Sequence, residues 1–129
     1  MARLRGQAKK DILIIEDEQF LGSLLIKKLE NSGFYVRSFF DGEAGLKEVE
    51  KKKPDLILLD IVLPGMDGWE VLRRLKEKKH LKDIPVLIIS NLGEPGDITK
   101  GRKAGATDYI IKADYSPQQI VDKVANILS

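Results

Sequence analysis

Short apolar runs alternate with amphipathic segments along almost the whole chain. Five runs have the length of strands, and turn-forming or polar residues separate them. They cover residues 12–15, 34–39, 56–59, 84–89 and 109–111. The third run is continuous and ends in Asp60, and a turn containing Pro64, Gly65 and Gly68 follows. Such a run is typical of a strand that is buried on both faces of a parallel sheet.

The segments between these runs place apolar residues at helical spacing, which predicts five helices. The helices are expected to start after residue 18, after Asp41, after Asp67, near residue 97 and after Ser116. Gly33 should end the first helix and Pro54 should end the second, near residue 53. Residues 67–70 and 116–119 both have the spacing of a capping box. Glycines and a proline weaken the fourth helix, expected over about residues 97–104.

Strands that alternate with helices, without an internal repeat, predict an α/β fold with helices on both faces of a parallel sheet. The first, third and fourth runs are the most apolar and should be central. This placement favours a flavodoxin-like, doubly wound, five-stranded sheet with strand order 2-1-3-4-5 and five helices. We expect one domain over residues 11–129 after a flexible basic tail over residues 1–10. A basic arm for an acidic partner is the alternative for that tail.

Composition narrows the function classes. The chain has 129 residues, of which 43% are hydrophobic and 33% charged, and this suits one globular domain. A net charge of +2 gives no reason to expect direct nucleic-acid binding, and the lack of cysteine excludes disulfides and thiolate chemistry. No apolar run approaches the roughly 20 residues that span a bilayer. We therefore expect a cytoplasmic protein without membrane contact.

Polar residues stand at the ends of four predicted strands. Glu16 and Asp17 follow the first strand, Asp60 ends the third, Ser90 follows the fourth, and Lys112 follows the fifth. The carboxyl ends of parallel strands share one edge, so these side chains should face a common pocket. Three neighbouring carboxylates repel one another and favour a divalent cation, for which Mg²⁺ is suited. A hydroxyl and an ammonium beside them suit a phosphoryl group, and a carboxylate there can form an aspartyl phosphate.

Each of these residues also has a purely structural explanation. Glu16 and Asp17 would be favourable acids in the first turn of a helix. Ser90 would be a turn residue, and Lys112 a surface lysine. Their joint placement at strand ends favours the phosphoryl site.

The sequence resembles the receiver domain of two-component response regulators over about residues 11–129. The segments that carry the resemblance are ILIIEDE (12–18), LLDIVLPGMDG (58–68), IIS (88–90) and GATDYIIK (105–112). The resemblance implies that Asp60 accepts a phosphoryl group from a sensor histidine kinase or a phosphotransfer protein.

It further implies roles for the surrounding residues. Asp17, Asp60 and the backbone carbonyl of Val62 would bind Mg²⁺ directly, and Glu16 would act through a water. Ser90 and Lys112 would contact the phosphoryl group. Tyr109 would be an aromatic switch that turns inward as Ser90 moves toward the phosphate. The face of the fourth helix, fifth strand and fifth helix would carry the signal to a partner or to a second protomer in a homodimer.

The sequence departs from the family pattern at several places. Glu16 stands where aspartate is commoner, and Ala113 follows Lys112 where proline is usual. A cis bond before a non-proline residue is costly, so we predict a trans Lys112–Ala113 peptide and a slightly displaced lysine. The glycines predict a short or mobile fourth helix.

Residues that tune dephosphorylation in this family also differ here. Val62 and Leu92 cannot hydrogen-bond a hydrolytic water, and Asn91 is bulkier than the usual alanine or glycine. We therefore expect the phosphoryl group to be lost slowly.

Three other functions are alternatives to a phosphorylated receiver. A hydrolase of the aspartyl-phosphate type would need a second catalytic acid where Val62 stands and an insertion to bind its substrate. A flavodoxin-like cofactor binder would need a Gly-, Ser- or Thr-rich loop where the acidic residues 16–18 stand. A receiver used only for protein contacts, without phosphorylation, remains the main alternative.

We expect no enzyme beyond self-phosphorylation and dephosphorylation. The chain ends with the fifth helix, so we expect no output domain; a stand-alone regulator and a receiver from a longer protein both remain open.

Overall fold

A computed structural model describes residues 9–129 and contains one five-stranded parallel sheet with order β2-β1-β3-β4-β5. The strands are β1 (Asp11–Ile15), β2 (Tyr35–Phe39), β3 (Leu56–Asp60), β4 (Val86–Ser90) and β5 (Asp108–Ile111). The helices are α1 (Gln19–Asn31), α2 (Gly42–Lys51), α3 (Gly68–Glu77), α4 (Pro95–Lys103) and α5 (Pro117–Leu128), with a short 3₁₀ helix, η1 (Lys112–Asp114), before α5. The predicted fold class and strand order are therefore confirmed. The tail predicted over residues 1–10 lies outside the described residues, apart from the exposed Lys9 and Lys10.

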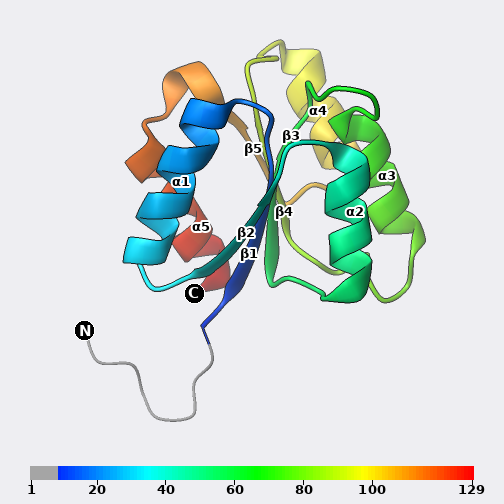
Figure 1. Ribbon diagram of the computed structural model, residues 1–129. Helices are drawn as coiled ribbons and strands as arrows, with labels where there is room; N and C mark the ends of the chain where they lie inside the picture. Colours follow the sequence, from blue (N-terminus) through cyan, green and yellow to red (C-terminus); the bar gives the residue numbers. More distant parts are fainter. Residues whose placement is uncertain (1–8) are drawn as a thin grey trace.

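The sheet lies between two helical layers, with α1 and α5 on one face and α2, α3 and α4 on the other (Figure 1). Alternation along the strands divides the core between these layers. Leu13, Ile57 and Ile88 pack with the α2–α3 side, whereas Ile14 and Leu58 pack with α1 and α5. Every residue of β1, β3 and β4 is buried. This two-sided burial explains why these three runs are continuously apolar in the sequence.

Several predicted boundaries are shifted by local chemistry. The second strand begins at Tyr35 rather than residue 34, and the fourth begins at Val86 rather than residue 84. Pro85 has no amide hydrogen to donate to the sheet, although its carbonyl accepts a hydrogen bond from Ile57 N. Helix α2 ends at Lys51, two residues before the predicted end.

Helix α4 begins earlier than predicted because proline is favourable at the start of a helix. Pro95 occupies the first turn, and the Asp97 carboxylate accepts a hydrogen bond from Glu94 N at 3.1 Å. The helix is nine residues long, so its predicted shortness is confirmed, while its mobility stays a prediction.

Two glycines shape connections of the fold. Gly33 has a φ of 95°, which lets the chain leave α1 and enter β2, as predicted. Gly68 starts α3 directly against the end of β3, where an added Cβ would collide with the Asp60 carbonyl oxygen. The predicted capping box at residues 67–70 is half formed. Asp67 accepts a hydrogen bond from Glu70 N, but the Glu70 carboxylate pairs with Arg73 and Arg74 instead.

Candidate functional site

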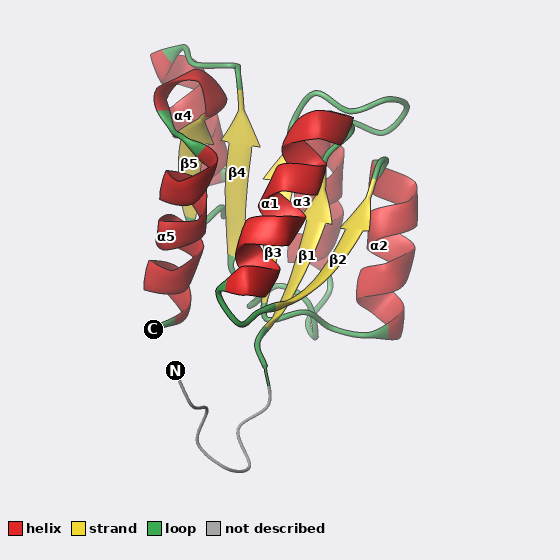
Figure 2. Cartoon of the chain, turned by 60° about the vertical axis from the view of Figure 1, so that its left-hand side comes forward, coloured by secondary structure: helices red, strands yellow, loops and turns green. Residues whose placement is uncertain are grey.

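All five strands run in the same direction, so their carboxyl ends lie at one edge of the sheet (Figure 2). Asp60 is the last residue of β3, beside Ile89 of β4, and Ser90 ends β4 beside Ile111. Glu16 directly follows β1, and Lys112 directly follows β5. The side chains therefore come from four strand ends that are far apart in the sequence.

Three carboxylates form an acidic cluster at this edge. Glu16, Asp17 and Asp60 each offer an oxygen within 4.8 Å of the others. Glu16 is fully buried and Asp60 is 3% exposed, whereas Asp17 is exposed. Two buried acids beside one that reaches solvent form an oxygen-lined site that is open on one side and could hold a metal ion.

Lys112 lies among the carboxylates and balances part of their charge. Its Nζ is 2.6 Å from Glu16 Oε1, 2.8 Å from Glu18 Oε2 and 3.0 Å from Asp60 Oδ2. Burial disfavours the charged ammonium and lowers its pKa. The hydrogen bonds to these carboxylates outweigh this effect, so the pKa of Lys112 is raised. Lys112 is therefore a permanent cation that touches Asp60.

Glu16 is held in an unfavourable electrostatic environment. Burial raises its pKa from 4.5 to about 7, although Lys112 and the Glu18 amide lower it and Asp60 adds repulsion. Its buried Oε1 forms the ion pair with Lys112 but lacks a well-oriented hydrogen bond. More positive charge would relieve this buried acid, so the residues fit a hard divalent cation.

The Asp60 side chain has a fixed orientation. Its Oδ1 accepts a hydrogen bond from Val62 N at 3.2 Å, and its Oδ2 accepts one from Lys112 Nζ at 3.0 Å. The observed contact with Val62 uses its amide, and the metal-ligand role of its carbonyl stays a prediction. The Val62 side chain is 58% exposed, and Asn91 and Leu92 are also exposed at the same edge.

Ser90 and Tyr109 converge on the loop after β4. Ser90 is fully buried, and its Oγ accepts a hydrogen bond from Leu92 N at 3.2 Å. Tyr109 is only 8% exposed, and its hydroxyl donates to the Leu92 carbonyl at 2.6 Å. Burial raises the pKa of Tyr109. The ring is thus turned inward, which is the orientation that the family resemblance implies for the phosphorylated state, and its role as a switch stays a prediction.

Helix α4 leaves room for this ring. A Cβ added at Gly101 would lie 2.9 Å from Tyr109 Cδ2 and 3.2 Å from Ile88 Cδ1. The glycine that lowers the helix propensity of α4 therefore has a packing role beside Tyr109.

The contact between Glu18 and Lys112 was not predicted from the sequence. In the sequence Glu18 is only part of the acidic segment after the first strand, and in the structure it is the residue that precedes α1. Its position next to the acid pair was the only available signal. The Lys112–Ala113 peptide is trans, as predicted, and Lys112 begins η1.

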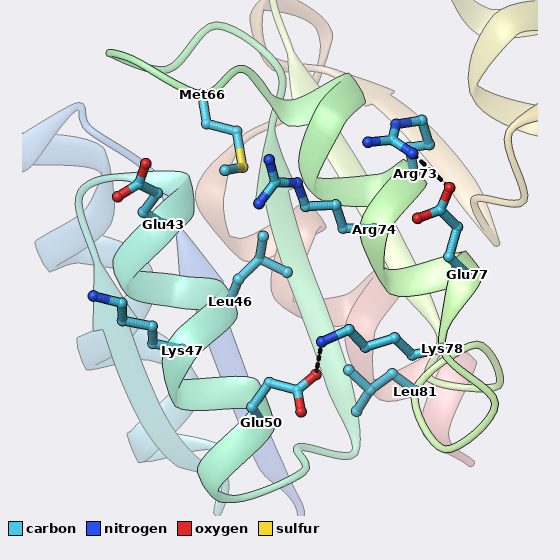
Figure 3. A pocket seen from close by; sticks show the side chains of 10 residues that line it. All are labelled: Glu43, Leu46, Lys47, Glu50, Met66, Arg73, Arg74, Glu77, Lys78 and Leu81. Carbon is cyan, nitrogen blue, oxygen red and sulfur yellow. Dashed lines mark hydrogen bonds and ion pairs between the residues drawn. The ribbon is translucent and has the colours of Figure 1, made fainter.

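A groove in the surface lies away from the acidic cluster. This groove has a volume of about 440 Å³ between α2 and α3, and Leu46, Met66 and Leu81 supply its apolar lining (Figure 3). Its walls carry charges of both signs, and the Lys78–Glu50 ion pair crosses one end. None of the predicted site residues lines it. Within residues 9–129, no helix is long and apolar enough to cross a membrane.

The fold and this arrangement define a class of signalling protein. The family model for the response regulator receiver domain matches residues 12–125, and the chain belongs to this family. The resemblance noted in the sequence is thereby confirmed, and the chain is a receiver domain of two-component systems.

Similar proteins include longer regulators. The chain is 40% identical over 119 residues to the alkaline phosphatase synthesis transcriptional regulatory protein PhoP of Bacillus subtilis, covering 92% of this chain and 48% of PhoP. It is 34% identical over 117 residues to the phosphate regulon transcriptional regulatory protein PhoB of Escherichia coli, covering 91% of this chain and 51% of PhoB. The chain thus spans about half the length of the curated relatives it matches.

Solved receiver structures agree with the fold. The Francisella response regulator 1452 receiver domain has a TM-score of 0.84 at 28% identity, covering 93% of this chain and 96% of that one. The phosphorylated cyanobacterial phytochrome response regulator RcpA has a TM-score of 0.82 at 32% identity, covering 93% and 91% of the two chains.

Proposed function

We propose that this receiver accepts a phosphoryl group on Asp60 from a phosphohistidine of a sensor histidine kinase or phosphotransfer protein. The observation that carries this proposal is the fixed Asp60 carboxylate, which contacts Lys112 and lies in an acidic cluster. An Asp60 oxygen attacks phosphorus, and the phosphorus–nitrogen bond to the donor imidazole breaks. The bonding electron pair stays on the imidazole, and the product is an aspartyl phosphate.

The other site residues would stabilise this transfer. Asp17, Asp60 and the Val62 carbonyl would hold Mg²⁺, with Glu16 acting through a water. When bound, Mg²⁺ would supply positive charge that offsets the carboxylates and the phosphoryl oxygens. Lys112 would contact the phosphoryl group as a cation, and the Ser90 hydroxyl would donate a hydrogen bond to it. We propose that the chain acts only on itself, by phosphorylation and dephosphorylation at Asp60.

Exposed apolar side chains support a protein as the donor. Six large apolar side chains are exposed in the described part of the chain. One begins β2, and the other five follow the carboxyl ends of the five strands, at the edge that carries Asp60: Phe20, Phe40, Val62, Leu92 and Tyr115. An acidic cluster with exposed apolar residues at the same edge of the sheet suits a protein partner that presents a phosphohistidine.

We further propose that phosphorylation changes the surface formed by α4, β5 and α5. Ser90 is bonded to the Leu92 amide and Tyr109 to the Leu92 carbonyl, so a movement of Ser90 toward a phosphate would disturb both contacts. Lys100 on α4 lies over the Trp69 ring, 4.4 Å from its centroid. Trp69 fluorescence is therefore a suitable probe of this change.

The proposed function is tested by incubating the protein with Mg²⁺ and acetyl phosphate and measuring its intact mass. One added phosphoryl group that disappears with EDTA or in Asp60→Asn supports the proposal. An unmodified wild-type protein under all conditions would favour the contact-only receiver.

A further inference from the structure

Glu18 places a further negative charge beside the site, although it is not one of the proposed metal ligands. Its Oε2 is 2.8 Å from Lys112 Nζ, while its backbone amide donates a hydrogen bond to Glu16 Oε2 at 2.9 Å. It precedes α1, yet its side chain makes no capping hydrogen bond with that helix. The carboxylate therefore bridges from the end of β1 to the lysine after β5.

The position of Glu18 gives it access to incoming ligands. Its side chain is 57% exposed, whereas the side chain of Lys112 is 10% exposed and that of Asp60 is 4% exposed. Lys112 is the cation expected to meet a phosphoryl group, and Glu18 contacts it from the solvent side. A phosphodonor that approaches Asp60 from solvent is therefore repelled by the charge of Glu18 before it can contact Lys112.

The net charge of the site determines how Glu18 affects an incoming phosphodonor. Glu16, Asp17 and Asp60 form the acidic cluster, and Lys112 together with a divalent cation would neutralise these three carboxylates. Glu18 lies outside that cluster and leaves one negative charge in excess. An excess negative charge disfavours a phosphodonor in proportion to the donor's own negative charge.

We propose that Glu18 is a specificity-determining residue that selects phosphodonors by charge, and this rests on the proposed function of Asp60. Acetyl phosphate is a doubly charged anion near pH 7. Phosphoramidate carries one negative charge less because its nitrogen is protonated, and it shares the phosphorus–nitrogen bond of phosphohistidine. Glu18 therefore disfavours acetyl phosphate relative to phosphoramidate.

Both donors lead to the same product by balanced steps. An Asp60 oxygen attacks phosphorus in each case. The phosphorus–oxygen bond to acetate breaks in one donor, and acetate leaves with the electron pair. The phosphorus–nitrogen bond breaks in the other, and the already protonated nitrogen leaves as ammonia. Any effect of Glu18 on the freedom of Lys112 acts on both donors, so the ratio of their rates isolates the effect of charge.

The test compares Glu18→Gln with Glu30→Gln, which makes the same change in net charge at the exposed far end of α1. Phosphorylation rates are measured by intact mass with each donor, at Mg²⁺ concentrations that saturate each variant in calorimetric titrations. Melting temperatures confirm that both variants are folded. We expect Glu18→Gln to raise the acetyl phosphate rate about threefold more than the phosphoramidate rate, as one charge at several ångströms in water implies. High salt should reduce this difference.

Glu30→Gln should keep the wild-type ratio of the two rates. An unchanged ratio in Glu18→Gln, with both donors active on the wild type, would overturn the inference about Glu18 and leave the proposed function standing. If neither donor modifies the wild type at Asp60, the proposed function itself fails.

Discussion

The Tyr109 hydroxyl donates a 2.6 Å hydrogen bond to the carbonyl oxygen of Leu92, two residues after Ser90. The same loop residue donates its amide to Ser90 Oγ. Leu92 therefore links the hydroxyl proposed to meet the phosphoryl group with the aromatic ring proposed to report it.

Tyr109→Phe removes this hydrogen bond while keeping the ring. We expect a loss of about 1 kcal/mol in the free energy of unfolding, because the Leu92 carbonyl loses its partner. Urea denaturation of the wild type and of Tyr109→Phe measures this loss in the free energy of unfolding. Tyr35→Phe is the matched control, since Tyr35 is 48% exposed and its ring keeps its contact with Lys52. Equal stability of Tyr109→Phe and the wild type would mean that the bond is not maintained in solution.

Gly101→Ala tests whether α4 is shaped around Tyr109. The new methyl group would meet the Tyr109 ring at 2.9 Å, and this overpacking should cost about 1–3 kcal/mol. Gly96→Ala in the same helix meets no atom within 4 Å and should be neutral or stabilising by about 0.5 kcal/mol. Urea denaturation of both variants and of the wild type measures these free energies of unfolding. Two variants of similar stability would contradict the packing role of Gly101.

The raised pKa of Glu16 predicts how stability depends on pH without divalent ions. Its pKa is about 7 in the folded protein against an ordinary 4.5, so between these values the folded state binds more protons than the unfolded state. Stability should therefore fall as pH rises from about 4.5 to 7, by about 1–3 kcal/mol. Groups with lowered pKa, such as Asp108, act at lower pH and do not obscure this window.

Urea denaturation at pH 5 and pH 8 in EDTA measures this difference. Glu16→Gln should flatten the dependence because the amide does not titrate, and Mg²⁺ should stabilise the wild type at pH 8. Stability that rises over the same interval would show that Glu16 ionises without the cost of burial.

The exposed Val62 side chain predicts a long-lived phosphoryl group. Val62 cannot hydrogen-bond a water beside Asp60, so loss of phosphate at neutral pH should take much longer than seconds. Val62→Asn places an amide there and should accelerate loss severalfold, without a cost in packing because the side chain is 58% exposed. Intact mass followed over time after donor removal measures both lifetimes. Phosphate loss from the wild type within seconds would refute the prediction.

The sequence predicted the residues whose position depends on strand ends. Asp60, Ser90 and Lys112 each end or follow an apolar run, so strand periodicity and parallel topology alone place them together. The inward orientation of Tyr109 and the packing role of Gly101 depend on how α4 meets the sheet, which no local pattern contains. The partners of the Glu18 and Glu70 carboxylates were not predictable for the same reason. Each carboxylate has several possible partners, and only the folded chain brings the actual one close.

Intact mass after incubation with Mg²⁺ and acetyl phosphate is the most direct measurement of the central claim. Three proteins are compared: the wild type, Asp60→Asn and Asp55→Asn. Asp55 precedes the same strand at its opposite end, where it accepts a hydrogen bond from Asp11 N. We predict one added phosphoryl group on the wild type and on Asp55→Asn, and none on Asp60→Asn. An adduct that persists in Asp60→Asn, or a wild type that gains none, would contradict the assignment of Asp60 as the phosphoryl acceptor.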